Sequence, residues 1–419
     1  MKYINVAEAN CKNCHRCLKV CPVKSIKFSD NKVEVMEDEC ILCGRCIRNC
    51  PQHAKSLVHD ITGIKQTVRN SARRKIAALA PSYLTSFGTE NRYKLAGALQ
   101  KLGFYAVEET AVGAHAVTKE YARILESDTM DNMITTCCPS IVFLVQKHFP
   151  KLTQYLAPVL SPMEAHGAFL RRKYGDDAFI VFFAPCISKI EEARISEKRY
   201  IDGVVTFKQL AAWFDEDGVK LPEAQEGYFG NDPSASAIYP VFEGIVKDVK
   251  ANLPDDSHVF RKYDFMSKQG AKDVFELFTE MNEGRIHNCF IEVSACYGSC
   301  INGPEKLDAG YYPVSNSMNV MRYLRDEHNI RETDLSGIDL SREIRPAPPK
   351  RDIPDEATIR SILAQIGKTK PEHEINCGSC GYRTCRDKAI AVYQGKADIN
   401  MCLPFFRDRA ENLSNMVME

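Results

Sequence analysis

The sequence predicts an α/β domain built from parallel sheets with flanking helices, with a small cysteine-rich domain on either side of it. Three observations predict this. Strand-like and helical runs alternate between residues 61 and 345, and eighteen cysteines fall at the start, middle and end of the chain. A proline-rich stretch at 345–354 separates the last group from the middle. We therefore expect three domains, at 1–60, 61–345 and 346–419.

Composition excludes several classes of protein. The 419 residues carry 55 Lys+Arg and 55 Asp+Glu, and this zero balance argues against a nucleic-acid or membrane partner. The longest apolar stretch, 179–185, is far shorter than the roughly 20 residues of a spanning helix. Residues 1–10 carry no signal-like pattern, so we expect a cytoplasmic protein. In that reducing compartment, eighteen cysteines indicate metal ligation rather than disulfides.

The first domain contains a duplicated cysteine run. Residues 11–21 and 40–50 both read C-x2-C-x2-C-x3-C before a proline, the run of bacterial two-cluster ferredoxins. The fourth cysteine of each run serves the other cluster, so we expect two 4Fe–4S clusters in a small α+β ferredoxin-like domain. The predicted ligands are Cys11, Cys14, Cys17 and Cys50 for one cluster, and Cys40, Cys43, Cys46 and Cys21 for the other. Zinc is the alternative, because paired C-x2-C motifs also bind zinc.

The middle domain predicts a largely parallel sheet. Its strand-like runs are 75–80, 132–136, 179–183 and 288–293, and its helical runs include 93–102 and 116–126. The basic residues between 65 and 75 are expected on a solvated helix face. Ligand sites in such sheets lie beyond the carboxyl ends of the strands.

Cysteines follow three of these strands. They are Cys137 and Cys138, then Cys186, then Cys296 and Cys300. We expect the three loops to converge on one pocket. Cys289 lies inside a strand-like run, and only one of the adjacent Cys137/Cys138 pair readily faces a cluster, which leaves the four thiolates that a cube needs.

The last domain carries four further cysteines. They are Cys377, Cys380, Cys385 and Cys402. Glycines beside two of them let the backbone approach a metal closely, so we expect a third 4Fe–4S cluster, with a zinc knuckle as the alternative. The pattern resembles the small C-G-x-C-G-x3-C cluster domain fused to other iron–sulfur proteins. Residues 405–419 are expected to form one solvated helix.

Three segments of the middle domain carry a family resemblance. Residues 135–139 (TTCCP), 185–192 (PCISKIEE) and 292–303 (EVSACYGSCING) resemble the signature segments of the iron-only (FeFe) hydrogenases. Those family segments read T-S-C-C-P, P-C-x-x-K-x-x-E and E-x-M-A-C-x-x-G-C-x-x-G. The resemblance spans about residues 61–345, and both flanking cluster domains are modules common in the family.

The resemblance implies an H-cluster, a 4Fe–4S cube joined to a two-iron unit with carbonyl, cyanide and dithiolate-amine ligands. The cube's matching ligands are Cys138, Cys186, Cys296 and Cys300, the last of them bridging to the two-iron unit. Cys137 matches the proton-transfer thiol and Lys189 the lysine that hydrogen-bonds a cyanide, with Glu192 beside it. The implied reaction is the reversible conversion of two protons and two electrons into dihydrogen. Implied partners are a ferredoxin or other redox protein and the maturation proteins for the two-iron unit.

The chain also departs from the family. Ala184 and Ser294 stand where methionines usually line the two-iron pocket, while Glu120 matches one proton-relay position and Val117 occupies the other. Such changes resemble the divergent, sensory branches, which implies slow turnover, dihydrogen sensing and a separate signalling partner. A different class remains open: an electron-transfer or cluster-assembly protein that carries only cubes. Retention of Cys137, Lys189 and Glu192, which serve the two-iron unit, favours the hydrogenase.

Overall fold

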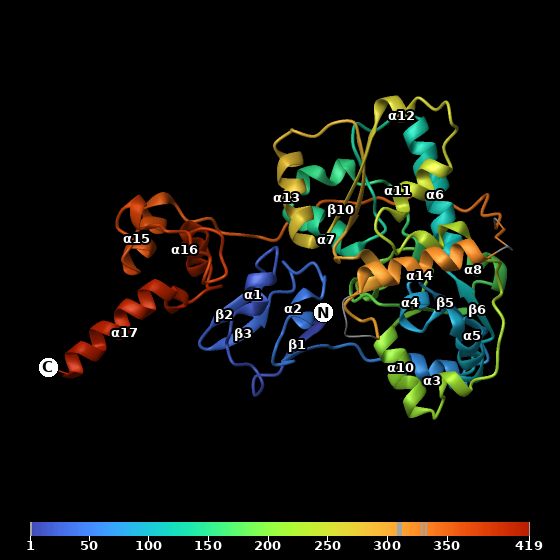
Figure 1. Cartoon of the computed structure of the whole chain (residues 1–419), viewed down its shortest axis with the longest axis horizontal. Helices are drawn as coiled ribbons and strands as arrows, with labels where there is room; N and C mark the ends of the chain where they lie inside the picture. Colours follow the sequence, from blue (N-terminus) through green and yellow to red (C-terminus); the bar gives the residue numbers. More distant parts are fainter. Residues whose placement is uncertain (1, 308–311, 328–329, 332, 419) are drawn as a thin grey trace. The chain divides into compact units, whose positions relative to one another are not determined.

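The computed structural model describes residues 2–307, 312–327, 330–331 and 333–418 (Figure 1). Its contacts divide the chain into two compact units. The first comprises Met1–Cys40, Gly44–His59 and Pro348–Glu419, and the second comprises Ile41–Cys43 and Asp60–Ala347. None of the described helices combines the length and apolar character required to cross a bilayer.

The amino-terminal part of the first unit is a small α+β fold. Its elements are β1 Ile4–Val6, α1 Arg16–Val20, β2 Ile26–Ser29, β3 Lys32–Val35, α2 Arg45–Arg48 and β4 Lys55–Leu57. Strands β1 and β4 pair antiparallel, as do β2 and β3. The β2–β3 turn is made by Asp30 and Asn31, whose φ values of 52° and 59° suit the twist of a two-residue hairpin.

The duplicated cysteine runs repeat a backbone conformation as well as a spacing. Asn13 and Leu42, at equivalent positions, have φ values of 50° and 56°. His15 and Gly44 likewise sit at 57° and 68°, immediately before the short helices α1 and α2. Non-glycine residues adopt this region rarely, so two runs that share it fold as two copies of one loop.

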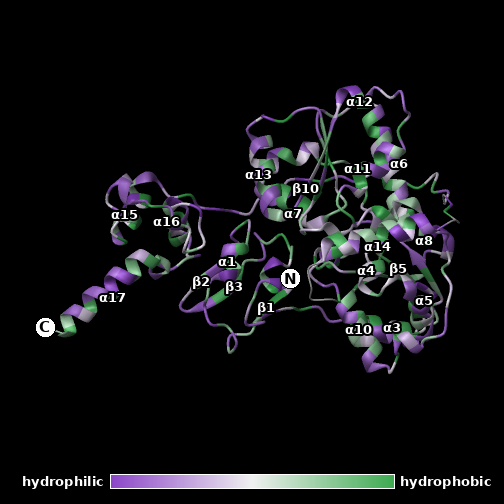
Figure 2. Ribbon diagram, in the orientation of Figure 1, coloured by the Kyte–Doolittle hydropathy of each residue, from purple (hydrophilic) through white to green (hydrophobic). Residues whose placement is uncertain are grey.

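The carboxy-terminal part of the first unit is helical. Its helices are α15 Glu356–Gln365, α16 Cys385–Tyr393 and α17 Leu403–Met418. Ile359, Ile362 and Leu363 of α15 pack on Ala389 of α16, which begins at a capping box between Thr384 and Asp387. Helix α17 buries no residue and alternates between purple and green along its length in Figure 2. The solvated helix predicted at 405–419 is therefore confirmed up to Met418, and Glu419 lies outside the described residues.

Both ends of the chain contribute to the first unit through specific contacts. The Phe28 N–H donates to the Lys396 carbonyl at 2.8 Å. The buried Glu39 carboxylate accepts from Lys396 Nζ at 2.5 Å and from Arg351 Nη2 at 3.5 Å. An ion pair of this kind holds the carboxy-terminal segment on the β2–β3 region.

The second unit contains two parallel sheets. The strands are β5 Lys75–Leu79, β6 Ala106–Glu109, β7 Met133–Ile134, β8 Phe179–Ala184, β9 Gly203–Thr206, β10 Asp264–Gln269 and β11 Cys289–Ser294. One sheet has the order β6-β5-β8-β9 and the other β10-β11-β7, with every pair parallel. All six residues of β8 and all six of β11 are buried, as expected for strands covered on both faces.

Helices connect and cover these strands. They are α3 Thr62–Asn70, α4 Tyr83–Ser86, α5 Arg92–Lys101, α6 Ala111–Glu126, α7 Pro139–His148, α8 Pro162–Tyr174, α9 Ser188–Ile195, α10 Phe207–Glu216, α11 Gly244–Ala251, α12 Val259–Lys262, α13 Ala271–Asn282 and α14 Pro313–Asp326. The α/β prediction is confirmed. The helix face expected for the basic residues 65–75 is wrong beyond Asn70, because α3 ends there and Arg73 instead donates to the carbonyls of Asp177 and Ala178.

Candidate functional site

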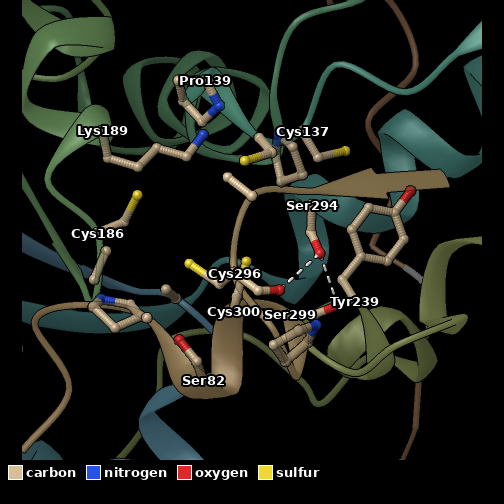
Figure 3. A pocket seen from close by; sticks show the side chains of 18 of the residues that line it. Ser82, Cys137, Pro139, Cys186, Lys189, Tyr239, Ser294, Cys296, Ser299 and Cys300 are labelled. Carbon is tan, nitrogen blue, oxygen red and sulfur yellow. Dashed lines mark hydrogen bonds between the residues drawn. The ribbon is translucent and has the colours of Figure 1, made fainter. Parts of the chain in front are cut away.

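The carboxyl ends of strands from both sheets open onto one cavity of about 110 Å³ (Figure 3). Its walls come from the residues that follow β5, β6, β7, β8 and β11. This is the edge where parallel sheets place their ligand sites. The five cysteines predicted to converge all line it: Cys137, Cys138, Cys186, Cys296 and Cys300.

The Cys-Cys-Pro sequence sets the first loop. Strand β7 ends at Ile134, and Pro139 starts α7, a position where its missing N–H costs nothing. Cys138 is the extended residue just before that helix, with φ −97° and ψ 105°. The neighbouring Cys137 packs against the hydrophobic core and lies 3.4 Å from the Tyr121 hydroxyl on α6. The two thiols therefore have different surroundings while sharing the cavity.

The other two loops lie against each other. Cys186 follows β8, and Cys300 lies in the 3-10 helix Ser299–Asn302 after β11. A Cβ on Gly303 would overlap the Pro185 carbonyl and approach the Pro185 Cβ to 2.8 Å, so this contact requires glycine. The Glu305 N–H also donates to the Pro185 carbonyl at 3.0 Å. These contacts hold the loops that carry Cys186 and Cys300 against each other at the cavity wall.

The thiols are electrostatically suited to a cationic iron core. Burial, with the nearby Cys186, raises the pKa of Cys138 to about 11. Burial also raises the pKa of Cys296 and Cys300, and the charges of the other cysteines add to the effect. Four thiolates this close repel one another in a desolvated space, and metal coordination removes that cost. The donor set therefore fits a cluster.

Lys189 brings one positive charge to the cavity wall. Its Nζ donates to Glu192 Oε2 at 2.6 Å and to Ser161 Oγ at 3.0 Å. Burial acts to lower the pKa of Lys189, but the Glu192 carboxylate outweighs it and the pKa is raised. Arg342 Nη1 donates to the other Glu192 oxygen at 3.1 Å. Glu192 thus fixes a charged ammonium at the cavity.

Several small residues also line the cavity wall. Ala184 and Ser294 both face the cavity, and Ser294 Oγ lies 3.1 Å from Ser299 Oγ and 3.3 Å from the Cys296 carbonyl (Figure 3). Ser82, which follows β5, also lines the cavity, and its buried Oγ has no hydrogen-bond partner among the described residues. A buried hydroxyl in this state suits a bound group that accepts a hydrogen bond.

Glu120, a predicted site residue, lies elsewhere, and Cys289 lies inside a strand as expected. Glu120 is not among the residues that line the cavity, and its carboxylate accepts two hydrogen bonds from Arg123, at 2.9 and 2.6 Å. Cys289 is buried inside β11 and donates to the His287 carbonyl at 3.2 Å. Sequence reasoning missed Ser82, Tyr121 and Tyr239 as neighbours of the site, because single polar residues in buried helices and turns carry no motif.

The carboxy-terminal cysteines share a second cavity. Cys377, Cys380, Cys385 and Cys402 all line one small cavity of about 20 Å³ in the first unit. Of the eight cysteines in the duplicated runs, Cys17, Cys21, Cys40, Cys46 and Cys50 are buried. No three His, Cys, Asp or Glu side chains of the described residues converge closely enough for a single metal ion. A cube spreads its thiolates more widely than zinc does, because each thiolate binds a different iron.

Comparison with known protein families agrees with these cysteine groups. Residues 73–304 match the family described as "Iron only hydrogenase large subunit, C-terminal domain". Residues 3–51 match a 4Fe-4S dicluster domain, and residues 374–404 match a "Putative Fe-S cluster" family. The first match alone covers more than half of the chain.

Individual relatives are distant. The chain is 27% identical over 297 residues to Iron hydrogenase 1 of Clostridium pasteurianum, covering 57% of this chain and 51% of that protein. It is 27% identical over 362 residues to the periplasmic Fe hydrogenase large subunit of Nitratidesulfovibrio vulgaris. This match covers 72% of this chain and 86% of that protein. The chain thus spans about half the length of the first relative.

The fold is shared with solved structures. A variant of the FeFe-hydrogenase HydA1 from Chlamydomonas reinhardtii superposes with a TM-score of 0.54 at 17% sequence identity. The match covers 69% of this chain and 99% of that one.

Proposed function

Because the chain belongs to the iron-only hydrogenase family, as a divergent member with iron–sulfur domains at both ends, we propose that it interconverts dihydrogen with protons and electrons at an H-cluster. The observation that carries the proposal is one cavity lined by a charged lysine and by Cys137, Cys138, Cys186, Cys296 and Cys300. Four of these cysteines, Cys138, Cys186, Cys296 and Cys300, would hold the cube, and Cys300 would bridge to the two-iron unit.

The bound H-cluster supplies the redox chemistry and the base at which dihydrogen forms or splits. The chain's own residues hold and surround it. The ammonium of Lys189 is a charge-assisted donor for a buried anionic ligand such as cyanide, and Glu192 keeps it in place. The Ser82 hydroxyl is a second donor to the same space. Apolar side chains around the cysteines, among them Met163, Phe182 and Ile245, exclude water.

Three further clusters would supply electrons. The duplicated runs near the amino terminus would hold two 4Fe–4S clusters, and the Cys377–Cys402 group a third. We propose a ferredoxin or another small redox protein as the electron partner. Maturation proteins are needed to deliver the two-iron unit.

We propose that turnover is slow and that the protein senses dihydrogen. Ala184 and Ser294 replace the methionines that the family places beside the two-iron unit. The side chains at these two positions of the cavity wall are therefore smaller, and that of Ser294 is more polar. Glu120, the matched relay carboxylate, is paired with Arg123 and does not line the cavity. A separate signalling partner would read the redox state of the clusters.

Infrared spectroscopy of anaerobically purified protein, after loading with the two-iron cofactor, tests the proposal. We expect carbonyl and cyanide bands that shift under dihydrogen, and about eighteen iron atoms per chain. Cys300→Ser should abolish the bands, whereas Cys289→Ser, which removes a buried thiol outside the cavity, should retain them. Absent bands with about sixteen iron atoms from four cubes would instead indicate the electron-transfer or assembly function.

Cys137 provides a second test. Because its thiol lines the cavity and is a proton carrier rather than a cube ligand in this proposal, Cys137→Ala should suppress turnover by about 100-fold. The same variant should show unchanged carbonyl and cyanide bands. Normal turnover by Cys137→Ala would remove this thiol from the mechanism.

A further inference from the structure

The residues matched to the family's proton relay do not reach the cavity in this chain. Val117 is fully buried in the hydrophobic core, and Glu120 is held by Arg123. Glu292 does line the cavity, but its carboxylate accepts backbone N–H groups at the start of α11, including Val246 at 2.9 Å. Backbone amides do not shuttle protons, so proton delivery requires other groups.

A continuous hydrogen-bonded network reaches the cavity wall through Tyr239. It includes Thr118, the residue that follows Val117 on α6. Tyr239, which lines the cavity, lies 2.7 Å from Thr118 Oγ1. Thr118 Oγ1 and Ser236 Oγ each lie 2.6 Å from the same oxygen of Asp248, Oδ2. Ser236 Oγ also lies 3.5 Å from His115 Nδ1. The network joins α6, the 3-10 helix Ala235–Ile238 and α11.

The chemistry of the groups fixes the direction of each hydrogen bond. An ionised carboxylate only accepts, so Thr118 and Ser236 both donate to Asp248. Thr118 must then accept from the Tyr239 hydroxyl, and Ser236 is left to accept from His115. Burial, with the nearby Cys137 and Asp248, raises the pKa of Tyr239, which keeps that hydroxyl protonated as a donor. Two donor chains therefore meet at one buried carboxylate.

All five members of the network are buried. Thr118 and Ser236 are fully buried, and His115, Asp248 and Tyr239 are 5%, 6% and 8% exposed. Every member is a hydroxyl, a carboxyl or an imidazole, and each of these groups both gives and takes a proton. The arrangement has the composition of a proton wire.

We infer that His115, Ser236, Asp248, Thr118 and Tyr239 form a proton relay into the cavity, replacing the carboxylate that Val117 lacks. The inference deepens the proposed hydrogenase function and rests on it.

The transfer balances as a chain of exchanges. His115 gives the Nδ1 proton to Ser236 Oγ while Ser236 gives its own proton to Asp248 Oδ2, and His115 regains a proton at Nε2. The Thr118 and Tyr239 hydroxyls then rotate, so that Thr118 donates to Tyr239 and Tyr239 donates toward the cavity. Asp248 passes its proton to Thr118 Oγ1 as Thr118 gives one to Tyr239, and Tyr239 releases one proton into the cavity, where Cys137 would receive it. One O–H or N–H bond forms for each that breaks, and one proton moves inward. The reverse order carries a proton outward.

The obvious alternative is that Asp248 only ties three helical segments together. Thr118→Val separates the two roles, because it removes one hydroxyl and keeps the β-branched shape while Asp248 keeps its Ser236 bond. Thr118→Ser restores the hydroxyl. Thr279→Val on α13, whose hydroxyl donates to the Phe275 carbonyl of its own helix, is the matched control. Tyr239→Phe interrupts the wire independently.

The experiment follows the carbonyl bands of cofactor-loaded protein by stopped-flow infrared spectroscopy after a pH jump, without turnover. In the Thr118→Val and Tyr239→Phe variants, we expect the bands to respond about 100-fold more slowly than in wild type, with a matching loss of dihydrogen production. Thr118→Ser and Thr279→Val should respond at the wild-type rate.

The outcomes separate the two claims. Wild-type protein without carbonyl bands would overturn the hydrogenase proposal and the relay with it. Intact bands that respond in Thr118→Val and Tyr239→Phe as fast as in wild type would overturn the relay alone. A slow response that Thr118→Ser fails to restore would assign the effect to packing and would also overturn the relay.

Discussion

Glu292 shows how burial makes an ordinary carboxyl titrate near neutral pH. Burial raises the pKa of Glu292 to about 7, although backbone N–H groups of α11 partly offset this. The folded protein therefore binds a proton that the unfolded chain releases above its ordinary pKa of about 4.5. This contribution is complete below that value and is lost as the pH rises through the folded pKa.

We predict that the free energy of unfolding of wild type falls by about 3 kcal/mol relative to Glu292→Gln across this window. The amide of Gln cannot ionise, so the variant lacks this pH dependence. Anaerobic guanidinium unfolding at both ends of the window measures the difference. Parallel pH profiles for the two proteins would contradict the predicted pKa.

Lys189 is the cavity's charged donor, and its removal should act on the two-iron unit rather than on the cubes. We predict that Lys189→Met retains about sixteen iron atoms per chain but binds little two-iron cofactor, because a cyanide bound in the cavity would lose its charge-assisted donor. Iron analysis and infrared spectra measure the two effects. Lys220→Met, which removes an exposed partner of Glu223, is the control. Full cofactor loading in Lys189→Met would rule out the donor role.

At the scale of elements, the packing of α6 on α8 depends on one glycine. A Cβ at Gly113 would overlap the Pro162 carbonyl and lie 2.7 Å from the His166 backbone nitrogen. Helix α6 also carries His115, Thr118 and Tyr121, so the position of this helix sets the geometry of the proposed relay.

We predict that Gly113→Ala lowers the free energy of unfolding by about 2 kcal/mol through overpacking. Gly63→Ala in α3 is the matched control, because nothing lies within 4 Å of its Cβ position. That variant should gain about 0.5 kcal/mol from the better helix propensity of alanine. Chemical denaturation of both proteins is the measurement, and equal effects would contradict the close α6–α8 packing.

The elements differ in how far the sequence reveals them. The strands at 75–79, 179–184 and 289–294 are predictable, because each is a short apolar run, and the cysteines after them mark the cavity edge. Helix α6 begins at Ala111 rather than at the predicted residue 116. The low helix propensity of Gly113 explains why the first turn is not predicted. The relay is not predictable, because its hydrogen bonds join residues 121 and 130 positions apart with no motif around them.

At the scale of the whole molecule, the ion pair between Glu39 and Lys396 joins distant parts of the first unit. The Glu39 side chain is 3% exposed and that of Lys396 is 12% exposed. Removing Lys396 leaves the buried Glu39 carboxylate with the longer Arg351 contact, and the loss of one partner of a buried pair costs about 3 kcal/mol.

We therefore predict that Lys396→Met lowers the temperature at which the iron–sulfur absorbance of the protein begins to bleach. Lys32→Met is the control, because its pair with Glu8 is 68% exposed on both sides and contributes little. Visible absorbance during anaerobic heating measures both variants. An unchanged onset for Lys396→Met would show that Glu39 does not depend on this pair.

The first unit is built from segments that lie far apart in the sequence, and this affects when it can fold during synthesis. Residues Met1–His59 leave the ribosome long before Pro348–Glu419, and at about 5–20 residues per second the interval is tens of seconds. During that time Glu39 lacks both Lys396 and Arg351, the partners supplied by the late segment. The first unit therefore remains incomplete while residues 60–347 are synthesised, and it is completed only when residues 348–419 follow.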